Sequence, residues 1–160
     1  MMVEIANVAG PDKTDRKILQ LLARDGRMAW SELAEKIGLS LTPTLRRVRQ
    51  LEEGGYIKGY VAQLDEGRLA GKVSVFVAVT LVNQSEEVIQ RFEEQIALSP
   101  EVMSCFLMTG DADYTLRVVV PDLDGYQHFL TRTLTRIPGV AHIKSSIALK
   151  QVLMRPSPLL

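Results

Sequence analysis

The chain has 160 residues, with 19 basic and 19 acidic side chains that cancel to a formal net charge of zero. A neutral chain exerts no overall attraction on nucleic acid, so binding of this kind would need a local basic surface. The hydrophobic content of 46% is enough for one large core or two small ones, and the single cysteine excludes an internal disulfide and a paired-cysteine zinc site.

Residues 1–11 lack any periodicity and predict a flexible arm. A first helix is expected to begin at Lys13–Asp15, with Asp12 or Thr14 as its cap, and to end at Asp25-Gly26. Its apolar face is formed by Ile18, Leu21 and Leu22. Trp30 follows this helix, and we expect it to anchor the core rather than to stack on a base.

Residues 31–53 have the pattern of two short helices joined by a tight turn. Gly38 stands where the first of them needs a residue that tolerates positive φ. Leu39 can then pack inward through the turn. Ser40 or Thr42 can cap the second helix, and Pro43 suits its first turn. This order is typical of a helix-turn-helix, whose second helix enters the DNA major groove.

The second helix has an apolar and a basic face at helical spacing. The residues expected to pack inward are Leu41, Leu45, Val48 and Leu51. On the other side, Arg46 can read guanine and Gln50 adenine, while neighbouring groups can hold phosphates. The predicted DNA-binding residues are Ser40, Thr42, Pro43, Thr44, Arg46, Arg47, Arg49 and Gln50. The alternative is an ordinary solvated basic helix face.

An alternating extended segment, Tyr56–Leu64, follows and predicts a wing or linking strand that completes a DNA-binding domain at 12–65. The second domain, 66–154, has a different pattern, and a tail at 155–160 follows it. Its expected elements are a strand at 73–82, a helix at 85–97, strands at 102–109 and 114–120, a helix from 121 to about 134, and a strand at 140–153. This βαββαβ order predicts a ferredoxin-like sandwich, and an α+β fold for the whole chain.

Apolar residues lie on both faces of the strand at 73–82. Two helices would cover one face of the antiparallel sheet, so the other face has to be solvated, bind a ligand or pair with another copy. The second set of apolar residues favours pairing. One basic helix neutralises few phosphates, so two or more copies are expected on one DNA.

The chemistry-bearing side chains give little support to an enzyme or a metal-sensing repressor. His128 is expected on the exposed side of a helix and His142 near the start of the last strand, without a metal-ligand spacing between them. Cys105 lies in an apolar strand, which predicts a buried inert thiol. We therefore expect no catalytic residues, no metal and no cofactor. The sequence has neither a signal segment nor a long apolar run, which predicts a soluble cytoplasmic protein without membrane contact.

Two independent regions resemble the Lrp/AsnC (leucine-responsive regulatory protein) family of transcriptional regulators. In the first region the matching motifs are Asp15-Arg-Lys-Ile-Leu, Asp25-Gly-Arg, Glu32-Leu-Ala, Gly38-Leu-Ser, Thr42-Pro, Arg46-Arg-Val-Arg-Gln-Leu-Glu52, Gly55-Tyr-Ile and Gly59-Tyr. In the second they are Thr109-Gly-Asp-Ala-Asp-Tyr-Thr-Leu116, Val120-Pro-Asp122 and Ile137-Pro-Gly-Val140. The resemblance covers nearly the whole chain, from about residue 12 to 153.

The resemblance implies a sequence-specific regulator of double-stranded DNA that forms homodimers and assembles them into tetramers or octamers. It also implies that an amino acid or related metabolite binds between dimers and alters DNA binding or assembly. The effector residues that it implies are Leu107, Thr109, Gly110, Asp111, Asp113, Leu123, Ser146, Ile147 and Ala148. Two positions depart from the family pattern: Leu41 stands where many relatives have proline, and Ser146 where the leucine-responsive type has a larger aromatic residue.

The loop at 109–113 has suitable chemistry for an amino acid. Gly110 lets backbone N–H groups approach a carboxylate, and Asp111 and Asp113 can pair with an ammonium group. The alternative is a hairpin turn in which glycine and aspartate only satisfy the turn geometry. A nucleoid-type architectural protein that wraps DNA without an effector is the second functional hypothesis.

Overall fold

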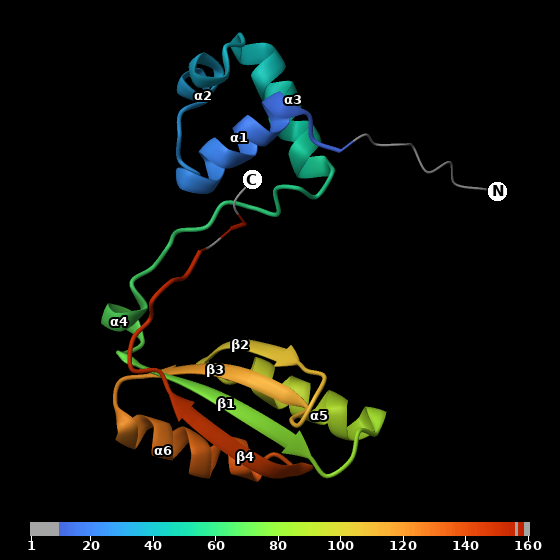
Figure 1. Cartoon of the computed structure of the whole chain (residues 1–160), viewed down its shortest axis with the longest axis vertical. Coiled ribbons are helices and arrows are strands. Elements are labelled where there is room, and N and C mark those ends of the chain that lie inside the picture. Colours follow the sequence, from blue (N-terminus) through green and yellow to red (C-terminus); the bar gives the residue numbers. More distant parts are fainter. Residues whose placement is uncertain (1–9, 156, 159–160) are drawn as a thin grey trace, which may run out of the picture. The chain divides into compact units, whose positions relative to one another are not determined.

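The chain divides into two compact units, as seen in a computed structural model that describes residues 10–155 and 157–158 (Figure 1). One unit is Leu64–Val152, and the other comprises Met1–Gln63 with Leu153–Leu160. We call them the sheet unit and the helical unit. The predicted arm lies outside the described residues at 1–9, as does the predicted tail at 156 and 159–160.

The helical unit contains three helices: α1 (Lys13–Arg24), α2 (Trp30–Ile37) and α3 (Leu41–Glu53). Asp12 caps α1 in a reciprocal capping box with Asp15, and Gly38 ends α2 with a left-handed φ of 74°. Both features agree with the prediction. The buried apolar core consists of Ile18, Leu22, Leu33, Val48 and Leu51.

Three predictions for this unit are wrong. Trp30 is no core anchor: it is the first residue of α2, is 38% exposed, and meets Tyr60 edge-on at 6.4 Å between ring centroids. Leu39 is exposed rather than packed inward. The segment Tyr56–Leu64 contains no strand. Its alternation fits extended backbone, but a strand also needs a hydrogen-bonded neighbour, and the structure gives this segment none.

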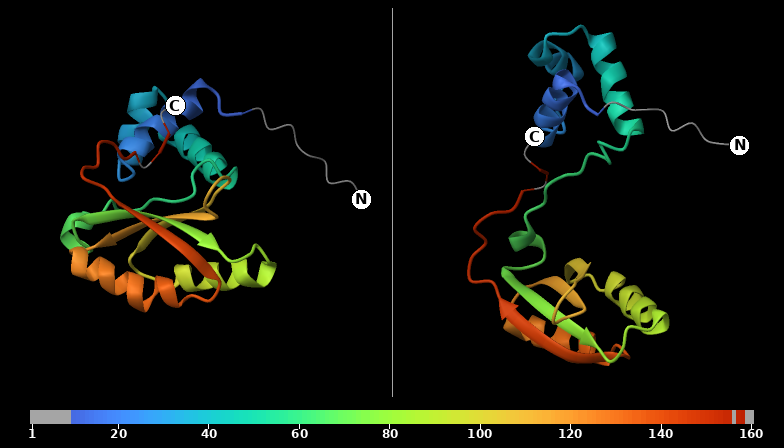
Figure 2. Two further views of the ribbon diagram at one scale, coloured as in Figure 1. Left: turned by 60° about the horizontal axis from the view of Figure 1, so that its bottom comes forward. Right: turned by 45° about the vertical axis from the view of Figure 1, so that its right-hand side comes forward.

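The sheet unit has the predicted βαββαβ order around one antiparallel sheet with strand order β2-β3-β1-β4. Helices α5 and α6 cover the same face of this sheet (Figure 2). The elements are α4 (Glu66–Leu69), β1 (Val73–Leu81), α5 (Glu86–Ala97), β2 (Val102–Leu107), β3 (Tyr114–Val120), α6 (Leu123–Arg132), η1 (Leu134–Arg136) and β4 (Val140–Ile147).

The core of the sheet unit lies between the sheet and these two helices. Val75, Val77 and Val79 alternate toward it from β1, as the two-residue period of a strand requires. Phe92 of α5 packs against Tyr114 of β3 with tilted rings whose centroids are 4.6 Å apart. The Tyr114 hydroxyl donates to Glu93 over 2.7 Å, which satisfies the polar end of an otherwise buried ring.

Several element boundaries differ from the prediction. β4 ends at Ile147 instead of 153. The two strands are antiparallel, so the end of β4 lies beside the start of β1 at Val73, and the backbone N–H of Ala148 donates to the Ser74 carbonyl there. Further along the chain, β1 has no more residues with which β4 could pair. β2 likewise ends at Leu107, two residues early. α6 ends at Arg132, and η1 follows it. The short helix α4, capped by Asp65, was not predicted.

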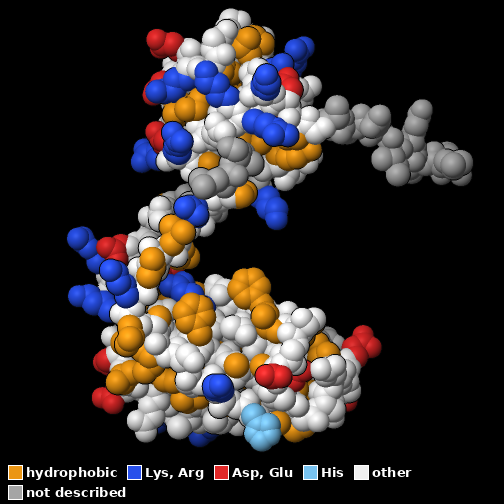
Figure 3. All heavy atoms as spheres, in the orientation of Figure 1, with side chains coloured by type: hydrophobic (Ala, Val, Ile, Leu, Met, Phe, Trp, Pro, Cys, Tyr) orange, Lys and Arg blue, Asp and Glu red, His pale blue; other side chains and the backbone are white. Residues whose placement is uncertain are grey.

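The sheet face opposite the helices carries exposed apolar side chains. Phe76 is 45% exposed and Phe106 is 60% exposed, and exposed hydrophobic groups are visible on the surface of this unit in Figure 3. By the strand register, Phe76 stands beside Arg117 on this face. Arg117 forms an ion pair with Glu66 of α4, with 3.1 Å between Nη1 and Oε1. We call this surface the open face.

Candidate DNA-binding surface and effector region

The exposed side of α3 forms one continuous surface, which we call the α3 stripe. A shallow hollow along it is lined by Thr42, Leu45, Arg46, Arg49, Gln50 and Glu53. Arg46 and Gln50 are therefore exposed on one side of the helix, as the base-reading prediction requires. Arg49, also among the predicted DNA-binding residues, lies on the same stripe. Leu45, which the sequence predicts in the core, is half-buried and lines this hollow.

The buried side of α3 differs from the predicted one, because it includes Thr44 in place of Leu41 and Leu45. Thr44 is fully buried, and its hydroxyl donates to the Ser40 carbonyl over 2.9 Å. The hydroxyl is thus satisfied within the helix and tolerates burial, which removes Thr44 from the predicted DNA contacts. Leu41, predicted to pack inward, is instead 46% exposed. Ser40 occupies the cap position of α3, but its side chain makes no capping hydrogen bond.

Arg47 is held inside the helical unit. Its Nη1 lies 2.7 Å from Asp12 Oδ2 and 2.8 Å from Asp15 Oδ1, so it ties α3 to the start of α1. The backbone N–H of Asp15 and the Arg47 guanidinium hold the pKa of Asp12 below its usual value, and both carboxylates raise the pKa of Arg47. In the free chain Arg47 therefore pairs with two carboxylates, and its predicted phosphate contact stays a prediction.

This arrangement predicts an acid-sensitive helical unit. Asp12 has a lower pKa folded than unfolded, so its contribution is present above the unfolded pKa, about 3.9, and is lost as the pH falls through the folded pKa. Asp12→Asn is expected to remove part of this loss. Unfolding followed by Trp30 fluorescence between pH 2 and 7 measures it, with Arg47→Gln as the matched variant. Identical pH profiles for wild type and Asp12→Asn would contradict the prediction.

The predicted effector residues fall into two groups. Leu107 and the loop at 109–113 lie near Val79, whereas Ile147 pairs with Val75 at the other edge of the sheet. Val75 and Val79 are four residues apart along β1, a distance of about 14 Å, and the edge strands β2 and β4 are three strand spacings apart, also about 14 Å. The two perpendicular steps together place the groups roughly 20 Å apart. Ser146 and Ala148 belong with Ile147, and Leu123 begins α6 after the nearby end of β3. One chain therefore does not bring these residues together around a single small molecule.

Asp113 closes its loop onto β1. Its carboxylate accepts from the Leu81 backbone N–H and from Gln84 Nε2, both over 2.7 Å. Its own backbone N–H donates to the Val79 carbonyl over 3.0 Å. Gln84 is a partner that the sequence reasoning missed, because 29 residues separate it from Asp113 and no local pattern connects them. A carboxylate can accept further hydrogen bonds, so an ammonium group remains a compatible additional partner.

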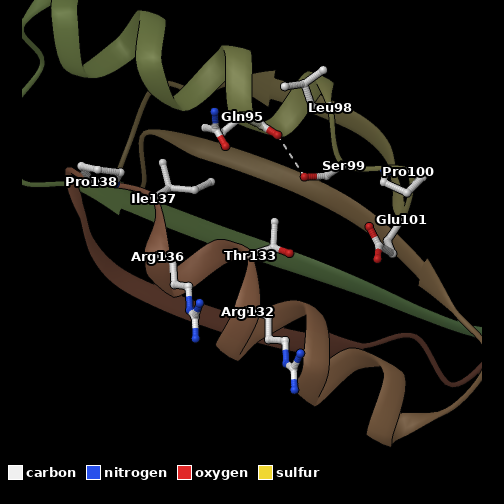
Figure 4. A pocket seen from close by; sticks show the side chains of 10 residues that line it. All are labelled: Gln95, Leu98, Ser99, Pro100, Glu101, Arg132, Thr133, Arg136, Ile137 and Pro138. Atoms are coloured by element: carbon white, nitrogen blue, oxygen red, sulfur yellow. Dashed lines mark hydrogen bonds between the residues drawn. The ribbon is translucent and has the colours of Figure 1, made fainter.

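A separate groove of about 350 Å³ lies on the helix-covered side of the sheet unit (Figure 4). Gln95 near the end of α5 and Ser99 just after this helix line it, and the Ser99 hydroxyl donates to the Gln95 carbonyl over 3.0 Å. Arg132 and Arg136 line it from the opposite side and extend in the same direction in Figure 4. None of the predicted effector residues contributes to its lining.

Cys105 differs from its prediction as a buried thiol. The side chain is exposed, because β2 is an edge strand of the sheet. Partial desolvation and the nearby Glu93 carboxylate raise the pKa of the thiol, which disfavours the reactive thiolate. His128 is exposed on α6 and His142 lies in β4, as predicted.

Residues 10–155 and 157–158 contain neither a metal-binding cluster nor a membrane-spanning helix. No group of three or more histidine, cysteine, aspartate or glutamate side chains could hold a metal ion there. Over the same residues, no helix has the length and apolar character needed to span a membrane.

Comparison with protein families matches both units. Residues 11–58 match a winged helix-turn-helix DNA-binding model, and residues 74–158 match the Lrp/AsnC ligand binding domain. The Bkd operon transcriptional regulator of Pseudomonas aeruginosa is 64% identical over 147 residues, which cover 92% of this chain and 96% of that protein. The leucine-responsive regulatory protein of Escherichia coli is 40% identical over 141 residues, 88% of this chain and 86% of that one.

Solved structures agree with the sequence matches. A transcriptional regulator of Neisseria meningitidis in complex with L-Met superposes with a TM-score of 0.88 at 36% identity, covering 92% of this chain and 96% of that one. An AsnC family regulator from Agrobacterium tumefaciens gives a TM-score of 0.87 at 40% identity, with the same coverage.

Proposed function

This chain belongs to the Lrp/AsnC family of DNA-binding transcriptional regulators, and we propose that it controls a Bkd operon in response to an apolar amino acid. The identity of 64% to a Bkd operon regulator supports the operon assignment. The structure in complex with L-Met, at 36% identity, supports an amino acid as effector. In this proposal the chain acts as a regulator, and none of its residues has a catalytic role.

The observation that carries the DNA-binding role is the α3 stripe. Arg46, Arg49 and Gln50 expose hydrogen-bond donors along one side of a helix whose opposite side is buried. Arginine and glutamine are the residues that recognise guanine and adenine by paired hydrogen bonds in the major groove. In this assignment Arg46 and Gln50 read bases, while Thr42 and Arg49 hold the backbone.

Arg46→Ala is expected to weaken binding to the cognate site by about 1–3 kcal/mol and to relax the preference at one base pair. The reason is the loss of one base-specific pair of hydrogen bonds. Titration of duplexes that carry each of the four base pairs at successive positions measures both effects. Equal weakening on cognate and random DNA would assign Arg46 to a phosphate instead.

The open face is the proposed dimer interface. Phe76 and Phe106 expose apolar surface there, and no helix of the sheet unit covers this face in the described residues. Pairing two open faces would bury these rings, and it would present two α3 helices to one DNA. Further assembly of dimers into tetramers or octamers belongs to the same proposal.

The two groups of effector residues are the argument for a ligand site between copies. Because about 20 Å separates Leu107 and Asp113 from Ile147 in one chain, an amino acid can contact both groups only if they come from different chains. Effector binding would then depend on assembly and alter it. Ser146, where leucine-responsive relatives carry a larger aromatic residue, favours an effector other than leucine.

A thermal-unfolding screen of the full-length protein against each proteinogenic amino acid tests the effector class. A ligand at about a hundred times its dissociation constant should stabilise the native state by ~2.7 kcal/mol. A selective hit that also changes the sedimentation pattern would support a site between copies. Absence of any stabilisation, together with similar affinity for cognate and random DNA at physiological salt, would favour the architectural alternative.

A further inference from the structure

Two leucines of α3 do not pack in the described core of the helical unit. Leu41 is exposed and Leu45 is half-buried. Within the described residues, neither is among the apolar side chains that form or pack against that core. An exposed leucine is ordinary by itself, so the position of the two residues has to carry the argument.

Both leucines accompany the groups that are proposed to bind DNA. Leu45 lines the same hollow as Arg46, Arg49 and Gln50. Leu41 is the first residue of α3 and precedes Leu45 by four positions, which places the two side chains next to each other on the helix. In a helix-turn-helix, the residues near the start of the second helix are those that reach base edges.

The major groove offers one apolar recognition group, the 5-methyl group of thymine. The donors of Arg46 and Gln50 cannot recognise it, whereas an aliphatic side chain can. We propose that Leu45, with Leu41 beside it, contacts a thymine 5-methyl group and thereby selects thymine at one position of each half-site. This inference rests on the proposed DNA-binding role of α3.

Replacement of thymine by deoxyuridine in the DNA tests the contact directly. Deoxyuridine keeps the base-pairing edge and removes only the methyl group. The duplex is one enriched by the full-length protein from a random pool, and each thymine is replaced in turn. We expect wild type to bind about fourfold more weakly after one such replacement, the factor for exposing one methyl-sized group. Leu45→Ala is expected to bind the two duplexes equally well.

Control variants separate this contact from general effects. Val48→Ala, in the core side of the same helix, should lower stability and keep the preference for thymine over deoxyuridine. Arg46→Ala should weaken binding and also keep it. Because the decisive change is made in the DNA, the wild-type result does not depend on the folding of any variant.

Three outcomes overturn the inference. They are an enriched site without thymine, wild-type affinity unchanged by every deoxyuridine, and a full preference retained by Leu45→Ala and Leu41→Ala. In each of these the DNA-binding role stands, and the leucines have another partner, such as a further protein surface. Failure of wild type to enrich any sequence would instead contradict the proposed function itself.

Discussion

Gly71→Ala is expected to destabilise the sheet unit through backbone strain and a steric clash together. Gly71 has a φ of +134°, and a Cβ atom there would lie 2.2 Å from the Val120 carbonyl oxygen and 2.4 Å from Pro121 Cα. These are backbone atoms at the end of β3, next to the point where Val73 pairs with Val120. Strain of about 1–3 kcal/mol from the backbone conformation and about 1–3 kcal/mol from overpacking add to about 2–6 kcal/mol.

Gly110→Ala is the matched control for this prediction. Gly110 also has a left-handed φ, +126°, but a Cβ atom added to it would meet no atom within 4 Å, so only the conformational cost of about 1–3 kcal/mol applies. The only tryptophan, Trp30, lies in the helical unit, so far-UV circular dichroism has to follow the sheet unit during denaturation. Equal losses for the two variants would rule out the collision with Val120.

Asp113→Ala is expected to abolish the response to the amino acid while leaving DNA binding without effector intact. It removes the acceptor for the buried Leu81 backbone N–H and for Gln84, and a lost hydrogen bond to a charged group costs about 1.5–3 kcal/mol. The sheet unit should therefore lose stability as well. The helical unit, which carries the α3 stripe, contains neither of these partners.

Asp113→Asn separates the two effects. Asparagine keeps an oxygen for the Leu81 N–H, so stability should recover in part, but it lacks the charge that an ammonium group would pair with. Asp111→Asn, two residues earlier in the loop, is the neighbouring control. Affinity for DNA is measured with and without the amino acid identified by the unfolding screen. A normal response in Asp113→Ala would show that this residue only shapes the loop.

The features predicted well from the sequence are those fixed by neighbours in the chain. The helix cap at Asp12, the left-handed turn at Gly38 and the order of the strands and helices all depend on local spacing. The exposed position of Arg46 follows from helical periodicity alone.

The wrong predictions have two causes. Some depend on contacts between residues that are distant in the chain, and others on the burial of side chains that the spacing of apolar residues does not predict. Thr44 can be buried because its hydroxyl is satisfied within the helix, whereas the periodicity of apolar residues assigns that side to Leu41. Cys105 is exposed because β2 is at the edge of the sheet, which strand propensity cannot reveal. The contact of Asp113 with Gln84 likewise depends on the assembled sheet. The effector region was therefore predicted less completely than the α3 stripe.

The engagement of Arg47 with Asp12 and Asp15 also has an expected consequence for the salt dependence of DNA affinity. Each phosphate neutralised on duplex DNA releases counterions and adds about 0.9 to the slope of log affinity against log salt. Three arginines in α3 suggest three such contributions per copy, but Arg47 already has its counter-charges within the protein. We therefore expect each α3 helix to contribute two arginines to counterion release, and the salt dependence of binding to be shallower than three free arginines would give.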